Sequence, residues 1–116
     1  MFLELAHTKK PVFEASKKFT LECYRITNGF PADEKFAMVQ QIRRAALSVH
    51  LNIAEGCSRK SITERKRFFE ISRGSLIEVD TAMDTAVDLN YVTTNKLQPL
   101  GTHLVSTFKQ LTGLIG

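Results

Sequence analysis

The sequence predicts an all-α protein, an antiparallel up-down-up-down four-helix bundle that forms one domain over residues 1–116. Apolar residues recur at spacings of three and four in four long segments, as on one face of a helix. No segment shows the sustained alternation of a β-strand. Only short connectors separate the four segments, so consecutive helices are expected to run antiparallel. With 116 residues, 43% of them hydrophobic, the chain is long enough for one core and is not disordered as a whole.

The first helix is expected over residues 10–27. Thr8 or a nearby residue is expected to cap it, and Pro11 suits its first turn, where a missing N–H costs nothing. Asn28-Gly29 is expected to end it, with Gly29 left-handed and Pro31 blocking continuation. Its inner stripe consists of Val12, Ser16, Phe19, Cys23 and Ile26.

The second helix is expected over residues 32–55. Asp33 and Glu34 fall in its first turn, where the helix dipole favours negative charge. Gly56 is expected to end it. Its inner stripe is the clearest in the chain and consists of Val39, Ile42, Ala46, Val49 and Ile53.

The third helix is expected to begin at Ser61, because Ser61-Ile62-Thr63-Glu64 matches a capping box. It continues to about Asn90 unless Gly74 bends it. The face expected to pack inward consists of Phe68, Ser72, Ser75, Val79, Ala82, Met83 and Ala86.

The fourth helix is expected to be capped by Thr94 or Asn95. Pro99 fits only near its start, because further in it would kink the chain. Its inner stripe consists of Leu97, Leu100, Leu104, Phe108, Leu111 and Ile115.

Four short motifs follow one another in the middle of the chain. They are Phe30-Pro31-Ala32-Asp33-Glu34, then Gln41-Ile42-Arg43-Arg44-Ala45, then Ser48 leading to Asn52-Ile53-Ala54-Glu55-Gly56 and Arg59, and finally Gly74-Ser75-Leu76-Ile77-Glu78. This succession resembles the four-helix bundle family encoded within intervening sequences of bacterial 23S ribosomal RNA genes. The resemblance covers residues 30–78 closely, and the flanking helices match in length and pattern.

The resemblance implies a small all-α protein that assembles as a ring-like homo-oligomer, most often a pentamer. The sequence also resembles the accessory protein of diversity-generating retroelements, a pentamer that works with a reverse transcriptase and RNA. Two positions depart from the family pattern. Ser58 stands where the family often has a second glycine, and His50 stands where it usually has an apolar or small residue.

A polar stripe runs along the second helix opposite its core stripe, and Glu78 lies at the edge of the third helix's apolar face. Two interpretations fit it. In one, an arginine pairs with a glutamate between the helices, while the serine and asparagine find backbone or side-chain partners. In the other, the stripe binds a ligand or a second subunit. The residues concerned are Arg43, Arg44, Ser48, Asn52, Glu55 and Glu78.

The second helix also carries apolar residues away from its core stripe, namely Phe36, Leu47, Leu51 and Ala54. Single exposed apolar groups are common on any protein. A second apolar stripe on one helix, however, favours an interface. We therefore expect Phe36, Leu47 and Leu51 to contact another copy of the chain.

The charge is uneven along the chain, whose net charge is +4. Basic residues gather between residues 59 and 73, whereas residues 74–93 contain four acidic residues and no basic one. The basic block fits a surface that follows RNA phosphates. It also fits a contact with the acidic part of a neighbouring subunit, or a solvated face. The phosphate contacts would be Arg59, Lys60, Arg65, Lys66 and Arg67.

Catalysis, metal binding and cofactor binding have no support in the sequence. The three histidines are scattered, and Cys57 has no base placed to activate it. No zinc spacing, phosphate-binding glycine loop or calcium loop occurs. No apolar run approaches a membrane span, and the N-terminus does not read as a signal peptide, so we expect a cytoplasmic protein with reduced Cys23 and Cys57.

These observations predict a non-enzymatic, self-assembling bundle associated with RNA or a ribonucleoprotein. The alternative is a protein–protein adaptor that binds no nucleic acid.

Overall fold

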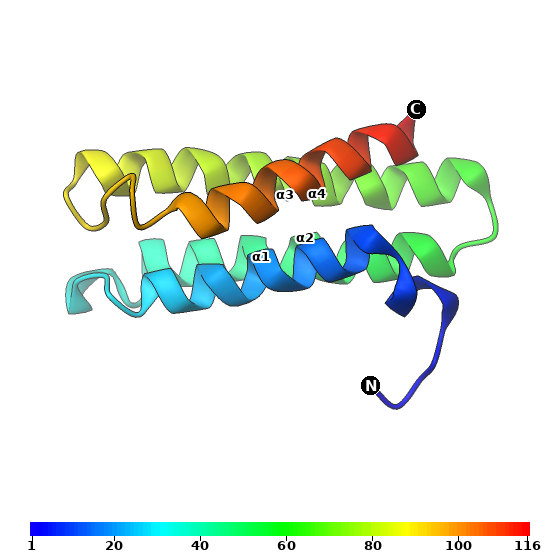
Figure 1. The fold of residues 1–116 in the computed structure, drawn as a ribbon, viewed down its shortest axis with the longest axis horizontal. Helices are drawn as coiled ribbons and strands as arrows, with labels where there is room; N and C mark the ends of the chain where they lie inside the picture. Colours follow the sequence, from blue (N-terminus) through cyan, green and yellow to red (C-terminus); the bar gives the residue numbers. More distant parts are fainter.

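The computed structural model describes residues 1–116 and contains four helices and no strand (Figure 1). The helices are α1 (Pro11–Thr27), α2 (Met38–Ser58), α3 (Ile62–Asp88) and α4 (Gln98–Ile115). Two short 3₁₀ turns, η1 (Ala6–Lys9) and η2 (Ala32–Glu34), precede α1 and α2. The predicted all-α, up-and-down four-helix fold is confirmed.

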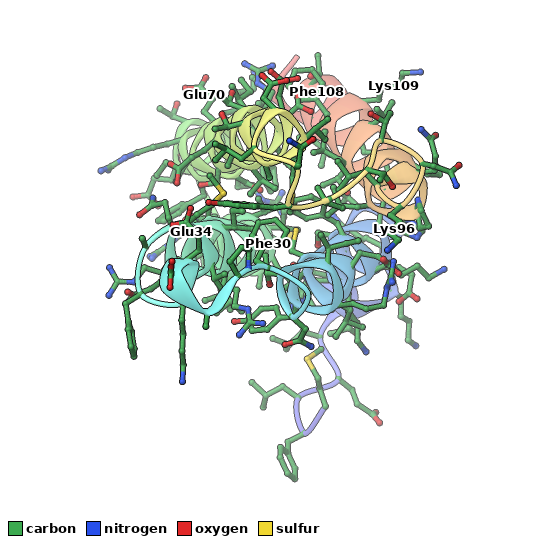
Figure 2. The ribbon with its side chains drawn as sticks, turned by 90° about the vertical axis from the view of Figure 1, so that its left-hand side faces the viewer. Phe30, Glu34, Glu70, Lys96, Phe108 and Lys109 are labelled. Carbon is green, nitrogen blue, oxygen red and sulfur yellow. The ribbon has the colours of Figure 1, made fainter.

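The helices form two layers, with α1 and α2 in one and α3 and α4 in the other (Figures 1 and 2). Each helix contacts two others around the bundle, α1 with α2 and α4, and α3 with α2 and α4. The pair α2–α3 is packed most extensively. Residues 1–5 leave η1 on the side of the α1–α2 layer and extend away from the bundle.

The core follows the predicted stripes. All five stripe residues of α1 and all five of α2 are buried, as are Leu100, Leu104 and Leu111 of α4. On α3 the prediction was partly wrong, because Phe68 is only half-buried. Phe69 and Leu76 fill the core in its place. The reason is that α3 packs against α2 on one side and α4 on the other, so its buried arc is wider than one stripe.

The end of α1 differs from the prediction. Gly29 does not adopt a left-handed conformation. Instead, the Gly29 and Phe30 N–H groups donate to the carbonyls of Ile26 and Thr27, and Arg43 of α2 donates to the Tyr24 carbonyl. Arg43 thus adds a side-chain donor from the next helix to a terminal carbonyl that also accepts from the Asn28 N–H. Thr8 does not cap the start of α1, since its hydroxyl donates to the carbonyl of Leu5, the residue before η1.

Helix α2 begins later and ends later than predicted. Ala37, with φ −124° and ψ −101°, separates η2 from α2, so Asp33 and Glu34 lie in the 3₁₀ turn. Glu34 there accepts a hydrogen bond of 2.9 Å from the Tyr91 hydroxyl in the α3–α4 connection. Gly56 does not end the helix but lies inside its last turn, facing Phe69.

The ends of α3 and α4 are explained by local chemistry. Ser61 caps α3 by accepting a hydrogen bond from the Glu64 N–H, as predicted. Gly74 lies within continuous α3. The helix ends with left-handed Asn90, φ 63°, and a Tyr91 N–H bond to the Ala86 carbonyl, which is a Schellman motif. Pro99 lies in the first turn of α4, where no side chain caps the helix.

Candidate functional site

The solvent face of α2 and the segment before it are apolar at the three positions predicted for an interface. Phe36 is 81% exposed, Leu51 59% and Leu47 39%. The opposite face of the same helix is in the core. A shallow hollow of about 300 Å³ lies between Phe36 and Leu47, and its lining includes Tyr24 and Arg44. Large apolar groups beside Tyr and Arg are the composition found at protein–protein interfaces.

The serine and asparagine of the polar stripe are satisfied between α2 and α3. The Ser75 hydroxyl donates to Ser48 Oγ at 2.9 Å. Asn52 Nδ2 donates to the Ser48 carbonyl at 2.8 Å and to Ser48 Oγ at 3.0 Å. These short side chains let the two helices approach closely. The expectation that Ser48 and Asn52 find backbone and side-chain partners is confirmed.

The arginines of the stripe do not pair with its glutamates. Arg43 points toward α1, where Nε donates to Thr27 Oγ1 at 2.9 Å and a terminal nitrogen donates to Asn28 Oδ1 at 2.9 Å. Its guanidinium also lies over the Tyr24 ring, 4.8 Å from the centroid. The expected Arg–Glu pair between helices is therefore wrong, because the turn of α2 places Arg43 on the α1 side.

The glutamates have partners of their own. Glu55 lies 3.4 Å from Arg59, one turn later on the chain, and both side chains are exposed. Glu78 accepts a hydrogen bond from Gln41 Nε2. Arg44 is exposed and has no carboxylate within 4 Å, so it is available at the rim of the α2 face. Of the six stripe residues only Ser48 and Asn52 bond to each other, so the six do not form one network.

Four cations of the basic block are exposed around the α2–α3 turn and the first turns of α3: Arg59, Lys60, Lys66 and Arg67. Of these only Arg59 has an ionic partner, Glu55. The Arg59 guanidinium also lies 4.9 Å from the centroid of Phe68. The other three cations are exposed and have no carboxylate within 4 Å, which leaves them free for an anionic partner.

Arg65 does not belong to this exposed set. Its terminal nitrogen donates to the Cys57 carbonyl at 3.1 Å, and its buried Nε has no partner. Arg65 therefore joins the start of α3 to the end of α2. Its predicted role as a phosphate contact is corrected to a structural one, because successive residues lie about 100° apart around α3 and position 65 turns toward the end of α2.

His50, which departs from the family pattern in the sequence, forms a hydrogen-bonded pair with Ser16 on the side of α2 that faces α1. His50 Nδ1 is 2.7 Å from Ser16 Oγ of α1, and the His50 ring packs on Phe13 with centroids 4.4 Å apart. Burial, then the charges of Lys17 and His7, lower the pKa of His50. Ser16 is fully buried and its hydroxyl also bonds to the Phe13 carbonyl, so the pair holds α1 to α2 and offers no accessible nucleophile.

The model of the 23S rRNA-intervening sequence protein family matches residues 8–113. The chain belongs to this family. A crystal structure of a protein of unknown function from the S23 ribosomal protein family of Bacteroides thetaiotaomicron superposes with a TM-score of 0.79 at 20% identity, covering 90% of this chain and 97% of that one. At that identity the likeness shows the fold alone. No curated protein matches the sequence.

The intervening-sequence family match includes α1, α2, α3 and all but the last two residues of α4, and with them the α2 face and the basic turn. The likeness to the accessory protein of diversity-generating retroelements stays a prediction, as does the pentamer. Groups of three or more His, Cys, Asp or Glu side chains placed to hold a metal ion do not occur. None of the helices has both the length and the apolar character needed to cross a membrane.

Proposed function

We propose that this family member is a non-enzymatic, cytoplasmic scaffold that self-assembles through α2 and associates with RNA through the turn that follows it. One observation carries the proposal: α2 and its turn present an apolar face and a group of unpaired cations to solvent on one continuous stretch of chain, residues 36–67. Apolar area suits a second copy, and unpaired cations suit phosphates.

Self-assembly is supported by Phe36 and Leu51, two large apolar side chains that are more than half exposed to solvent in the single chain. Burying one such side chain contributes roughly 1.5–3 kcal/mol. A ring of identical subunits would repeat the basic turn once per subunit, so that a weak site gains avidity. A pentamer is the expected state.

Light scattering tests assembly. The unmodified protein should have the mass of an oligomer larger than a dimer at tens of micromolar, and Leu51→Glu should shift the mass toward the monomer with helicity retained. Leu21→Glu is the matched control, because Leu21 is 61% exposed on α1, outside the α2 face. A monomeric unmodified protein, or equal effects of the two replacements, contradicts the proposal.

RNA binding is tested by the anisotropy of a fluorescein-labelled RNA hairpin between 50 and 200 mM KCl. With three or four phosphate contacts per subunit, the association constant should fall about 40- to 150-fold over this range, because each contact releases close to one counterion. Replacing Lys60, Lys66 and Arg67 with Glu should abolish binding. The control replaces Asp84 and Asp88 with Lys and should bind at least as well.

The second candidate is an adaptor that binds proteins and no nucleic acid. The hollow between Phe36 and Leu47, lined by Tyr24 and Arg44, favours it. An assembled protein that shows no affinity for the RNA hairpin at 50 mM KCl, or whose triple variant binds the hairpin as well as the original, leaves the adaptor as the better description.

A further inference from the structure

Residues 1–5 form an arm whose four apolar side chains are exposed. Phe2 is fully exposed, at 106% of its reference area, and Leu3 is 68% exposed. Met1 and Leu5 are exposed as well. A run of consecutive large apolar groups in water is unfavourable and marks a segment that another surface covers.

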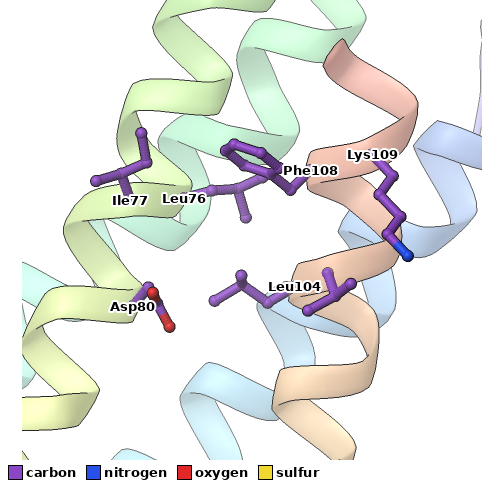
Figure 3. A pocket seen from close by; sticks show the side chains of 7 residues that line it. Leu76, Ile77, Asp80, Leu104, Phe108 and Lys109 are labelled. Atoms are coloured by element: carbon purple, nitrogen blue, oxygen red, sulfur yellow. The ribbon is translucent and has the colours of Figure 1, made fainter. Parts of the chain in front are cut away.

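A groove of about 330 Å³ lies between α3 and α4 (Figure 3). Leu76 and Leu104 are buried at its base, and Ile77, Val105 and Phe108 line it. The volume is at the lower end of the range for pockets that hold small molecules, roughly 300–1,000 Å³. The groove therefore has room for one or two apolar side chains.

The rim of the groove carries two charged side chains that have no ionic partner. Asp80 stands on the α3 side and Lys109 on the α4 side (Figure 3), and neither has an oppositely charged group within 4 Å. The arm carries a single charged side chain, Glu4. In an extended chain Phe2 and Glu4 project from the same side, about 7 Å apart. A Phe2 ring seated in the groove thus allows Glu4 to meet Lys109 at the rim.

The arm and the groove belong to opposite sides of one molecule. Turn η1 contacts only α1 and α2, and the arm points away from the layer of α3 and α4 (Figures 1 and 2). Glu4 lies at most about 7 Å of chain from Ala6. Figure 2 places Lys109 on the far layer. The arm of one chain is therefore placed to meet the groove of a second chain seated on its α1–α2 layer.

We propose that the N-terminal arm of one copy docks in the α3–α4 groove of the next, with Phe2 in the groove and Glu4 paired with Lys109. This inference rests on the self-assembly proposed above and adds a head-to-tail contact to it. Such a contact joins two different surfaces, so repetition closes a ring or extends a filament. The α2 face lies on the same layer as the arm, so both contribute to one junction.

Cross-linking between two separately purified variants tests the contact. Glu4→Cys and Lys109→Cys are each made in a Cys57→Ser background, mixed, and oxidised with diamide. Cys23 is buried, and burial raises the pKa of its thiol, so it should not react. We expect a disulfide between the two variants, seen as a band of twice the chain mass on a non-reducing gel. Lys96→Cys replaces Lys109→Cys in the control, because this exposed lysine lies in the turn before α4, thirteen residues earlier, and does not line the groove.

Reversing the charges of Glu4 and Lys109 tests the same contact through the strength of assembly, without introducing cysteines. Glu4→Lys and Lys109→Glu should each weaken assembly, and the double variant should regain it. Phe2→Ala should weaken assembly at least about tenfold.

An assembled protein that forms the control disulfide as readily as the Glu4–Lys109 disulfide, or that keeps its mass without residues 1–5, overturns the arm contact and leaves the proposed α2 interface standing. A monomeric unmodified protein overturns both. RNA affinity is measured separately and does not depend on the outcome.

Discussion

The Phe69 ring of α3 packs directly on the backbone of Gly56 in α2. A Cβ atom at position 56 would stand 2.7 Å from Phe69 Cε1 and 3.2 Å from the Arg65 carbonyl. The glycine is thus required by the close approach of α3 and not by a left-handed backbone. The Gly56-containing motif of the second helix and the buried Phe69 act as one packing unit.

Gly56→Ala should lower the free energy of unfolding by about 1–3 kcal/mol, because the added methyl group forces Phe69 or α3 to move. Urea denaturation followed by circular dichroism measures it. Phe69→Leu in the same chain should recover part of the loss. Gly74→Ala is the control, since a Cβ there meets nothing within 4 Å and should stabilise the helix by about 0.5–1 kcal/mol. A neutral Gly56→Ala would contradict the packing.

Arg43→Ala should lower the free energy of unfolding by about 1.5–3 kcal/mol. The replacement removes charged hydrogen bonds to Thr27 and Asn28 and one of the donors to the Tyr24 carbonyl, which keeps the Asn28 N–H. Arg44→Ala, one residue later and exposed, should change stability by no more than about 0.5 kcal/mol. Equal effects in urea titrations would show that Arg43 does not cap α1.

Replacing Arg65 should affect stability and not RNA binding, whereas replacing its neighbour Lys66 should affect RNA binding and not stability. Arg65→Ala removes the bond to the Cys57 carbonyl and should cost about 1–2 kcal/mol of stability. It should leave hairpin affinity unchanged while the protein is folded. Lys66→Ala should reduce hairpin affinity and leave the urea midpoint in place, because the side chain is exposed. The reverse pattern would restore Arg65 to the phosphate-binding set.

Stability should fall as the pH drops below about 6.5. Folding lowers the pKa of His50 from its usual value near 6.5, through burial and then the charges of Lys17 and His7. Below that value the unfolded chain binds the proton more readily than the folded one, so acid favours unfolding. His50→Gln, which keeps a polar partner for Ser16 but does not titrate, should flatten the decline. If the melting temperatures of the unmodified protein and of His50→Gln change with pH in parallel between pH 8 and 5, His50 does not have this role.

The helices and most of their inner faces could be predicted because they depend on local periodicity. Val39, Ile42 and Val49 recur at spacings that put them on one face wherever the helix packs. Ser61 caps α3 through an atom three residues away. The exposed apolar face of α2 was visible for the same reason, since Leu47 and Leu51 are one turn apart and off the core stripe.

The partners of polar side chains could not be predicted in this way. Whether Arg43 meets a glutamate of α3 or the end of α1 depends on how α2 is rotated within the bundle, and no local spacing encodes that rotation. The same holds for His50 and Ser16, which are 34 positions apart.

By itself, the sequence determined which segments are helices, which faces are apolar and where the charge gathers, because each depends on residues within a few turns of one another. Only the tertiary structure decided that Arg65 turns inward, that Gly56 admits Phe69, and that the arm stands on the layer opposite the α3–α4 groove. These depend on distances between segments remote in the chain, which are set when four helices pack together and bury a common core.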